Sequence, residues 1–337
     1  MQYLLLSIIF LALALTSYLA CRYLVYFSHK HSILDETTQR SSHSHPTPRI
    51  GGISFTLLIL LTINIFFYFE GLGLNKNYYL ALVIPTFLVA AISVLDDIRK
   101  GISRIVRLIA HLIASVLALA LTGLIPNTAH TLIIFCVSVI AIAWFINLFN
   151  FMDGIDGIAA TEAIFIIGAL AGYSFFADES HWGVLQLMIL APILGFAVIN
   201  WQPARIFMGD IGSTFLGVLI PILLIVSTQL NLLTVWSAII LTSSFLMDST
   251  WTLLTRFTTG QKWYEPHRSH LYQIMSRKMG SHCKVSILNL LLNMIWTLPI
   301  SIAATIFPNF GQLFTLLALL PILVLCIMHR SGQTDSN

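Results

Sequence analysis

The sequence has few charged residues. Asp, Glu, Lys and Arg make up only 9% of its 337 residues, while 57% of the residues are hydrophobic. A soluble domain has about 25% charged residues, so this balance excludes a soluble globular protein. Cysteine is also scarce. Its four positions, Cys21, Cys136, Cys283 and Cys326, lack the spacing of metal ligands, and we assign them no role.

Long hydrophobic runs are abundant instead. Eleven segments approach the roughly 20 residues that a helix needs to cross a bilayer. They lie near residues 3–27, 52–70, 78–95, 104–123, 131–148, 157–177, 184–201, 213–228, 234–256, 285–307 and 310–328. The first has neither a basic leader nor a small-residue cleavage site, so we expect it to be retained. The sequence thus predicts an all-α, polytopic membrane protein with ten or eleven membrane-spanning helices, in which residues 1–337 form a single domain.

The basic residues lie on one side of this predicted arrangement. With eleven spans, the loops that start near residues 28, 96, 149, 202 and 257 share one side with the C-terminal tail. Sixteen of the seventeen Lys and Arg residues lie in or next to these segments, and only Lys76 lies opposite. The positive-inside rule therefore places these loops in the cytoplasm and the N-terminus outside it.

One polar stretch, NLFNFMDGIDG, interrupts the hydrophobic sequence at residues 147–157. Its Asn147, Asn150, Asp153 and Asp156 are spaced three apart, so a helical or 3₁₀ backbone would place them along one face. Polar groups at the mouth of a hydrophobic helix are costly unless a polar or cationic partner meets them, which makes this stretch a candidate site. An ordinary solvated turn between two spans is the alternative.

Two adjacent acids, Asp96 and Asp97, end the third predicted span. The helix dipole leaves partial negative charge at this end, and neighbouring carboxylates repel each other. A bound cation would relieve both effects, and paired carboxylates suit Mg²⁺, which usually takes further ligands from substrate phosphates. The alternative is neutralisation in solvent by Arg99, Lys100 or Arg104.

The loop before the second span contains HSHPTPRIGG at residues 43–52. Pro46 and Pro48 keep the backbone extended, and Gly51 and Gly52 allow close approach of backbone amides. Arg49 offers a guanidinium suited to a phosphate. A plain positive-inside anchor is an equal alternative for this arginine.

Glycines flank an acid in the loop after the seventh span, IFMGDIGSTFLG at residues 206–217. We expect Ser213 to cap the next helix, whose free amides form an anion site. Asp210 is placed to hold a metal ion beside that anion. Phe207 is a candidate for stacking on a nucleotide base, although packing in lipid or core is the commoner fate of such a residue.

The last large cytoplasmic loop contains KWYEPHRSHLYQ at residues 262–273. His267, Arg268 and His270 are donors that can face a diphosphate. Metal binding by the histidines is less favoured, because no cysteine, HExxH pattern or third ligand accompanies them. The alternative is a surface loop with incidental histidines.

Two further acids fall within predicted spans. Asp248 lies near the middle of the ninth span. It is either a functional group or a neutral one that is hydrogen-bonded to Ser or Thr hydroxyls of a neighbouring helix. Glu162 lies early in the sixth span, and we expect it to be solvated at the interface.

In this order, the motifs TPRIGG, DDIRK, NLFNFMDGIDG, FMGDIGSTFLG and PHRSHLYQ closely resemble those of the polyprenyl-phosphate N-acetylhexosamine-1-phosphate transferases, glycosyltransferase family 4. The resemblance covers residues 45–273. PHRSHLYQ is most similar to the branch that starts O-antigen synthesis on undecaprenyl phosphate. Two departures from the muramoyl-pentapeptide branch argue against a peptidoglycan substrate. The loop lacks paired histidines followed by an acid, and Ser44 stands where that branch has Lys.

The resemblance implies a multi-pass enzyme of the bacterial inner membrane. It would transfer N-acetylhexosamine 1-phosphate from a UDP-N-acetylhexosamine to undecaprenyl phosphate, release UMP and start the synthesis of O-antigen lipopolysaccharide or a related cell-envelope glycan. A peptidoglycan or teichoic acid precursor is the alternative product. Membrane lipid is a further expected partner, no nucleic acid is expected, and a homodimer is left open.

The resemblance also assigns roles to individual residues. Mg²⁺, which Mn²⁺ can replace, would be held by Asp96, Asp97 and Asp210. Asp96 or Asp97 would be the catalytic residue that deprotonates or orients the acceptor phosphate. The nucleotide sugar would lie against Asn147, Asn150, Asp153, Asp156 and Phe207. Phosphates would contact Arg49, His267, Arg268 and His270.

A secondary transporter is the alternative from another class, because intramembrane acids such as Asp248 also mark ion pathways. Transporter sites lie near the middle of the membrane, whereas the acids of the motifs all fall at one predicted face. No inverted repeat is evident in the sequence. The distribution of acids therefore favours the enzyme.

Overall fold

The computed structural model describes residues 2–31, 46–70, 75–99, 101–265 and 267–333. Within these ranges the chain is helical and has no β-strand, which confirms the predicted all-α class. The α-helices are α1 (Gln2–Lys30), α2 (Gly52–Glu70), α3 (Lys76–Arg99), α4 (Arg104–Leu121), α5 (Ala129–Phe151), α6 (Ile158–Phe176), α7 (Ser180–Asn200), α8 (Gly209–Gln229), α9 (Val235–Leu241), α10 (Ser243–Thr258), α11 (Leu271–Met279), α12 (His282–Leu292), α13 (Leu298–Ile306) and α14 (Gly311–Met328). A π-helical turn, η1 (Asn293–Thr297), joins α12 to α13, and a 3₁₀ turn, η2 (Pro308–Phe310), precedes α14.

Ten helical segments of the described chain are long and apolar enough to cross a membrane, and they coincide with ten of the eleven predicted spans. The predicted ninth span, 234–256, differs because it breaks at Thr242 into the shorter helices α9 and α10. The Thr242 hydroxyl donates to the carbonyl of Ile239 at 2.9 Å. Such local bonds let Ser and Thr compete with helical backbone bonding, so the hydroxyl-rich run Thr242–Ser244 favours a break.

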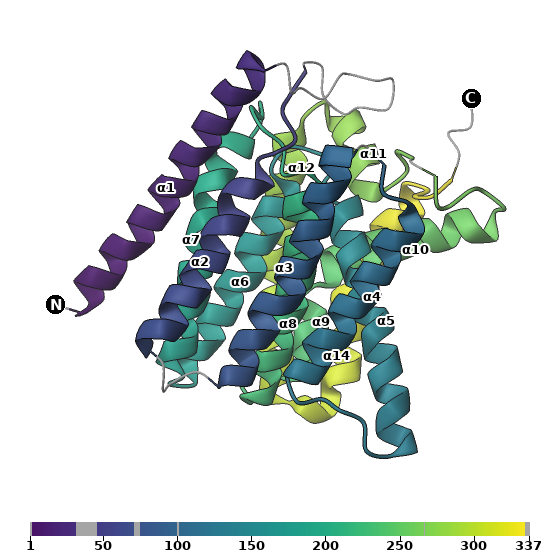
Figure 1. The fold of residues 1–337 in the computed structure, drawn as a ribbon. Coiled ribbons are helices and arrows are strands. Elements are labelled where there is room, and N and C mark those ends of the chain that lie inside the picture. Colours follow the sequence, from purple (N-terminus) through teal and green to yellow (C-terminus); the bar gives the residue numbers. More distant parts are fainter. Residues whose placement is uncertain (1, 32–45, 71–74, 100, 266, 334–337) are drawn as a thin grey trace.

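The long helices run up and down a bundle, with α1 beginning at its lower end (Figure 1). The chain just after α14 lies beside the loop before α11, because Gly332 N donates to Ser269 O at 2.9 Å. The described chain therefore begins and finishes at opposite ends of the bundle. This agrees with an odd number of crossings, in which α9 and α10 together complete the ninth.

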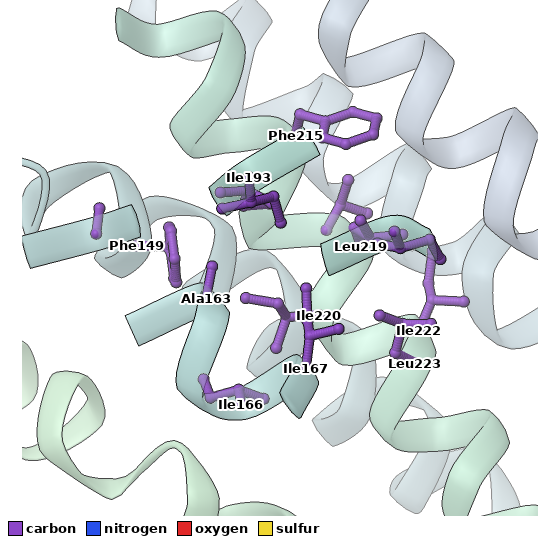
Figure 2. Close-up of a cluster of buried hydrophobic side chains, with 14 of the residues drawn as sticks. Phe149, Ala163, Ile166, Ile167, Ile193, Phe215, Leu219, Ile220, Ile222 and Leu223 are labelled. Atoms are coloured by element: carbon purple, nitrogen blue, oxygen red, sulfur yellow. The ribbon is translucent and has the colours of Figure 1, made fainter. Parts of the chain in front are cut away.

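Helix α8 is the centre of the bundle. Every residue from Ile211 to Leu224 is buried. Figure 2 shows Phe149 of α5, Ile167 of α6 and Ile193 of α7 in the cluster of buried side chains that also contains residues of α8. A helix that is apolar on all sides can be covered either by lipid or by other helices, and in α8 the neighbouring helices provide the cover. The first turn of α8, which carries Asp210, is thereby fixed in the middle of the bundle's motif-bearing end.

The outer helices keep large apolar side chains on their exposed faces. Leu11 of α1, Ile133 of α5 and Leu316 of α14 are each at least 60% exposed. In water such surface would be a large unfavourable patch, whereas the hydrocarbon of a bilayer is its natural solvent. The exposed surface therefore agrees with the polytopic membrane class that the composition predicts.

Backbone bonds join the loop before α2 to the loop before α8. Gly51 N and Gly52 N donate to the carbonyls of Phe207 and Met208, each at 2.9 Å, and Phe207 N donates to Pro48 O at 2.8 Å. The close approach expected at the two glycines is thus confirmed. It brings two motifs that are about 150 residues apart in sequence into direct contact.

A substitution at Gly52 tests how closely these segments pack. A Cβ atom there would lie 2.4 Å from Gly212 N and 2.6 Å from Met208 O, and both are backbone atoms that cannot move away cheaply. We expect Gly52→Ala to destabilise the protein by about 1–3 kcal/mol, as overpacking does, and to lower the melting temperature in detergent. Gly172→Ala in α6 is the matched control, because a Cβ there meets nothing within 4 Å. Equal melting temperatures for the two variants would contradict the close packing.

Candidate active site

The polar stretch 147–157 does not continue as a helix. α5 ends at Phe151, and Asp153 and Asp156 lie on the loop that leads to α6. Gly157 ends this loop at φ +78°, a left-handed conformation that glycine adopts without strain. The two acids therefore have separate surroundings and do not extend a helical face that starts at the asparagines.

Arg107 of α4 joins two of the predicted metal ligands. Its Nη1 lies 3.2 Å from Asp96 Oδ2, near the end of α3, and 3.2 Å from Asp210 Oδ2, in the first turn of α8. Asp96 also accepts a hydrogen bond from Ile102 N at 2.6 Å. The guanidinium offsets the unfavourable position of Asp96 at the C-terminal end of a helix, and it reduces the repulsion between the two carboxylates.

Arg107 is a residue that the sequence analysis missed. Of the neighbours named there as neutralising groups, Arg104 donates to Tyr264 O at 3.0 Å. The side chain of Arg99 and all of Lys100 lie outside the described part of the chain. The one available signal was position, because Arg107 lies one helical turn after Arg104 and shares its helix face.

Asn150 belongs to the same cluster. Its Nδ2 donates to Asp210 Oδ1 at 3.1 Å and to Ser213 Oγ at 2.8 Å. The prediction that Ser213 caps the following helix is wrong, because α8 begins one turn earlier, at Gly209, and Ser213 Oγ donates to Gly209 O inside the helix at 2.9 Å. Gly209, at φ +70°, allows the chain to enter the helix before Asp210.

The described side chains include no group of three Asp, Glu, His or Cys residues arranged to hold a metal ion. The side chain of Asp97, the predicted third ligand, lies outside the described part. Asp96 and Asp210 nevertheless fit what Mg²⁺ takes from a protein, since it is usually bound by one or two carboxylates plus waters and substrate phosphates. Both acids converge on one cationic nitrogen, so the position between them favours positive charge.

Asp153 is a half-buried acid next to this cluster. Burial, and then the nearby charges of Asp210 and Asp156, raise its pKa well above the ordinary value, while Arg49 lowers it. Arg49, Asp153 and Asp210 are therefore close enough to interact electrostatically, as expected for parts of one site. A carboxyl with a raised pKa in such a place is typical of functional acids.

Asp156 is bonded to the protein itself. Its Oδ2 accepts from Ala204 N at 3.0 Å, and its Oδ1 lies 3.1 Å from His282 Nδ1 at the start of α12. Its backbone carbonyl accepts from Ser286 Oγ at 2.9 Å. The side chain thus holds the 152–157 loop against α12, and its predicted contact with the nucleotide sugar stays a prediction. His282 is a second residue that the sequence analysis did not single out.

The histidine loop, residues 261–270, carries the predicted phosphate-binding groups. The rings of His267 and His270 lie 4.8 Å apart between centroids. Ser269 N and Ser269 Oγ approach His267 Nδ1 at 3.4 and 3.0 Å. Because the backbone N–H can only donate, Nδ1 of His267 is an acceptor and the ring proton lies on Nε2. Arg268 is half-buried, and its carbonyl accepts from Arg277 at 2.8 Å.

Asp248 anchors the helix that follows this loop. Its carboxylate accepts from the amides of Leu271 and Tyr272 at 2.8 and 3.1 Å, and from the hydroxyl of Thr252 at 3.1 Å. An acid at the first amides of a helix stabilises it through hydrogen bonds and the dipole. The predicted hydroxyl partner from a neighbouring helix is not found: the Thr252 hydroxyl belongs to α10 itself, and the neighbouring helix α11 supplies backbone amides instead. His270 Nδ1 lies 3.5 Å from the same carboxylate.

Tyr272 connects the histidine loop to the loop of residues 152–157, called here the acid loop. Its hydroxyl donates to Phe151 O at 2.8 Å and lies where a Cβ of Gly154 would be, which explains a glycine at that position. Burial, Asp248 and Asp153 together raise the pKa of Tyr272 well above its ordinary value, so it stays a neutral donor. The five motifs therefore meet at one end of the bundle.

Glu162 is not solvated, contrary to the prediction. It is fully buried and accepts hydrogen bonds from Ser244 of α10 at 2.8 Å, from Asn289 of α12 at 2.8 Å and from Asn293 of η1 at 2.7 Å. The bundle covers this end of α6 with α10 and α12, which sequence hydropathy does not reveal. Glu162 thereby ties α6, which follows the acid loop, to α10 and to the α12–η1 segment.

Two predicted nucleotide-sugar contacts lie at the edges of the cluster. Asn147 Nδ2 donates to Ala143 O within α5 at 2.7 Å, and the buried His111 of α4 lies beside it. Phe207 is half-buried and forms the backbone bonds to the first loop described above. The contacts of these two residues with the nucleotide sugar stay predictions.

The neutral state of His267 gives a testable dependence of stability on pH. Burial, His270 and Arg256 lower its pKa from 6.5 to about 3, with Asp248 acting in the opposite direction. The unfolded chain therefore gains a proton near pH 6.5 that the folded chain does not bind. This contribution to stability is fully present above pH 6.5 and is lost as the pH falls towards 3.

We expect the melting temperature in detergent to fall less between pH 7.5 and pH 5 for His267→Gln than for the wild type. The exposed His130 of α5 supplies the matched control, His130→Gln, which is expected to follow the wild type. The same fall for all three proteins would show that His267 is not held neutral.

Comparison with known proteins matches the acid-bearing part of the site to one family. Residues 79–228 match glycosyl transferase family 4. This range contains Asp96, Arg107, Asn150 and Asp210, while Arg49 and the histidine loop lie outside it.

Curated relatives extend the similarity beyond this range. A probable undecaprenyl-phosphate N-acetylglucosaminyl 1-phosphate transferase of Bacillus subtilis is 24% identical over 304 residues, which cover 86% of this chain and 83% of the relative. A phospho-N-acetylmuramoyl-pentapeptide-transferase of Staphylococcus carnosus is 29% identical over 222 residues, 59% of this chain and 67% of the relative. With its ten apolar helices, this is a multi-pass protein of the bacterial inner membrane, and its residues 79–228 are similar to glycosyl transferase family 4.

Proposed function

We propose that the protein transfers N-acetylhexosamine 1-phosphate from a UDP-N-acetylhexosamine to undecaprenyl phosphate, as the first membrane step of O-antigen or related cell-envelope glycan synthesis. The convergence of Asp96 and Asp210 on Arg107 Nη1, at 3.2 Å each, carries this proposal. It collects carboxylates and a cation at one end of an apolar bundle, where a lipid phosphate and a soluble nucleotide can meet.

In the proposed reaction, an oxygen of the lipid phosphate attacks the β-phosphorus of the UDP-sugar. The bond from that phosphorus to the oxygen shared with the α-phosphate breaks, and UMP leaves with the electron pair. Undecaprenyl diphosphate carrying the sugar remains in the membrane. Such a transfer depends on positioning and charge neutralisation more than on covalent help from the protein.

Mg²⁺, or Mn²⁺ in its place, would be held by Asp96, Asp97 and Asp210 and would neutralise charge on the diphosphate when bound. One of the adjacent pair, Asp96 or Asp97, deprotonates or orients the acceptor phosphate. Asn150 holds Asp210 in place through its amide and leaves its carbonyl oxygen as an acceptor for a sugar or base donor.

The remaining roles follow from the grouping of the motifs. The nucleotide sugar lies over Asn147, Asn150, Asp153, Asp156 and Phe207. Its phosphates and the lipid phosphate are met by Arg49, His267, Arg268 and His270. In this arrangement His267 donates from Nε2 as a neutral ring, because its Nδ1 accepts from Ser269.

A muramoyl-pentapeptide donor is the second candidate. The relative from Staphylococcus carnosus, which carries that name, favours it. The O-antigen type of donor is preferred here because PHRSHLYQ lacks paired histidines followed by an acid. The two candidates share the acceptor lipid and the release of UMP, so only the donor distinguishes them.

A reconstitution assay tests the proposal. Purified protein in detergent is given undecaprenyl phosphate, Mg²⁺ and a panel of UDP-N-acetylhexosamines together with UDP-N-acetylmuramoyl-pentapeptide, and UMP release is measured. We expect lipid-dependent release from an N-acetylhexosamine donor. Asp97→Asn and Asp210→Asn should each lower it by about 100-fold or more, since charge stabilisation at the transferring phosphoryl group contributes several kcal/mol.

Asp178→Asn is the control, because Asp178 is exposed between α6 and α7, away from the motif-bearing end. Its positive φ is tolerated by Asn. Release from the muramoyl donor alone would select the second candidate. If no donor gives lipid-dependent release of UMP, the transferase proposal is wrong.

The metal assignment has a test that does not use activity. Removing the guanidinium in Arg107→Met leaves Asp96 and Asp210 without their shared cation, so we expect a lower melting temperature in chelator. Added Mg²⁺ should then raise the melting temperature more in Arg107→Met than in the wild type, where the guanidinium already occupies the position between the acids. NaCl at equal ionic strength controls for screening. An equal Mg²⁺ effect on both proteins would count against a cation site between these acids.

A further inference from the structure

The chain just after α14 packs against the histidine loop. Ser331 is 1% exposed, and its amide donates to Cys326 O at 2.9 Å, which ends α14 in a tight turn. Residues Ser331, Gly332 and Gln333 are called here the C-terminal strap, and Gly332 lies between α10 and the loop. Gly332 N donates to Ser269 O, and Gln261 Nε2 donates to Gly332 O, both at 2.9 Å. The strap is thus bonded to both ends of the loop, at Gln261 and at Ser269.

Gly332 fits this place for two separate reasons. Its φ of +84° is strained for any residue with a side chain. A Cβ there would also lie 2.5 Å from Thr252 O and 2.8 Å from Thr255 Cβ, both on α10. The strap therefore has no room to accept a side chain at this position without leaving the loop.

The bonds of the strap lead directly to His267. Ser269, whose carbonyl the strap binds, is the residue whose amide and hydroxyl approach His267 Nδ1. Arg256 of α10 also reaches this loop: its Nη1 donates to Gln261 Oε1 at 2.8 Å and lies 3.4 Å from Ser269 Oγ. Ser269 is therefore held from the strap and from α10 together, and it fixes which nitrogen of His267 presents a proton.

We propose that the C-terminal strap is a positioning element of the phosphate site, in which Gly332 holds Ser269 so that His267 presents Nε2–H to a substrate phosphate. The strap acts on His267 through Ser269 and is therefore a positioning element. This inference rests on the proposed function for the phosphate role of His267. The contact between the strap and the loop does not depend on that function.

The test compares Gly332→Ala with Gly123→Ala. Gly123, at the far end of α4, has a φ of +83°, and a Cβ there meets nothing within 4 Å. Because the φ angles at the two positions are nearly equal, we expect similar backbone strain in both variants, and only Gly332→Ala places a side chain against α10. Hydrogen exchange of the amides in residues 261–270 is the first measurement. We expect exchange to rise by about tenfold or more in Gly332→Ala and to match the wild type in Gly123→Ala.

Steady-state kinetics are the second measurement. We expect Gly332→Ala to raise KM for the UDP-sugar by about 10-fold with a much smaller change in kcat, because a lost phosphate contact of this kind weakens ground state and transition state alike. The double variant His267→Gln, Gly332→Ala should be no worse than His267→Gln alone, since the strap acts through that ring. A merely structural defect would instead add to the effect of His267→Gln.

Gln261→Met is a second variant in case Gly332→Ala does not fold. It removes the side-chain bond to Gly332 O, together with the bond that Gln261 accepts from Arg256, and leaves Gly332 in place. Unchanged hydrogen exchange in the loop of the folded variants would contradict the proposal that the strap positions this loop. Raised exchange with additive kinetic effects would overturn its action through His267. If the wild type releases no UMP with any donor, the proposed function fails, and the exchange measurement alone decides whether the strap positions the loop.

Discussion

Polar groups buried in an apolar bundle must find their partners inside the protein, because hydrocarbon offers none and an unpaired group costs several kcal/mol. This constraint holds the motif-bearing end together. Glu162 of α6 accepts from Ser244 of α10 and from two asparagines, Asn289 and Asn293, near the end of α12. Asp248, one turn further along α10, receives the first amides of α11. Each acid joins elements that are far apart in sequence, so the acid loop and the histidine loop take up one fixed arrangement.

On this frame the protein brings like charges together. Asp96, Asp153 and Asp210 come from three separate elements, and their mutual repulsion would open the site if nothing opposed it. Arg107 and Arg49 reduce that repulsion, and the first turn of α8 favours the charge of Asp210. Under the proposed function, a bound cation would relieve the repulsion that remains between these acids and would neutralise charge on the phosphates, which phosphoryl transfer needs.

Much of the fold and part of the site could be predicted from local patterns. A membrane helix depends mainly on its own hydrophobicity, so ten spans were found in the sequence alone. The prediction failed where neighbours decide the outcome. Ser213 lies inside α8 because Gly209 starts the helix earlier, and Glu162 is buried because α10 and α12 cover it. The break at Thr242 was hidden because hydropathy averages over a window and misses a short hydroxyl run.

The sequence by itself determined the membrane class, the side on which the basic loops lie and the identity of the acids, because composition, charge and short motifs carry these properties locally. Only the tertiary structure decided which residues meet. Arg107 between two acids, His282 against Asp156, and Gly332 under Ser269 are contacts between elements as far as 126 residues apart. Such pairs leave no periodic or spacing signal in the chain, since their proximity is set by the packing of helices that are themselves defined only by being apolar.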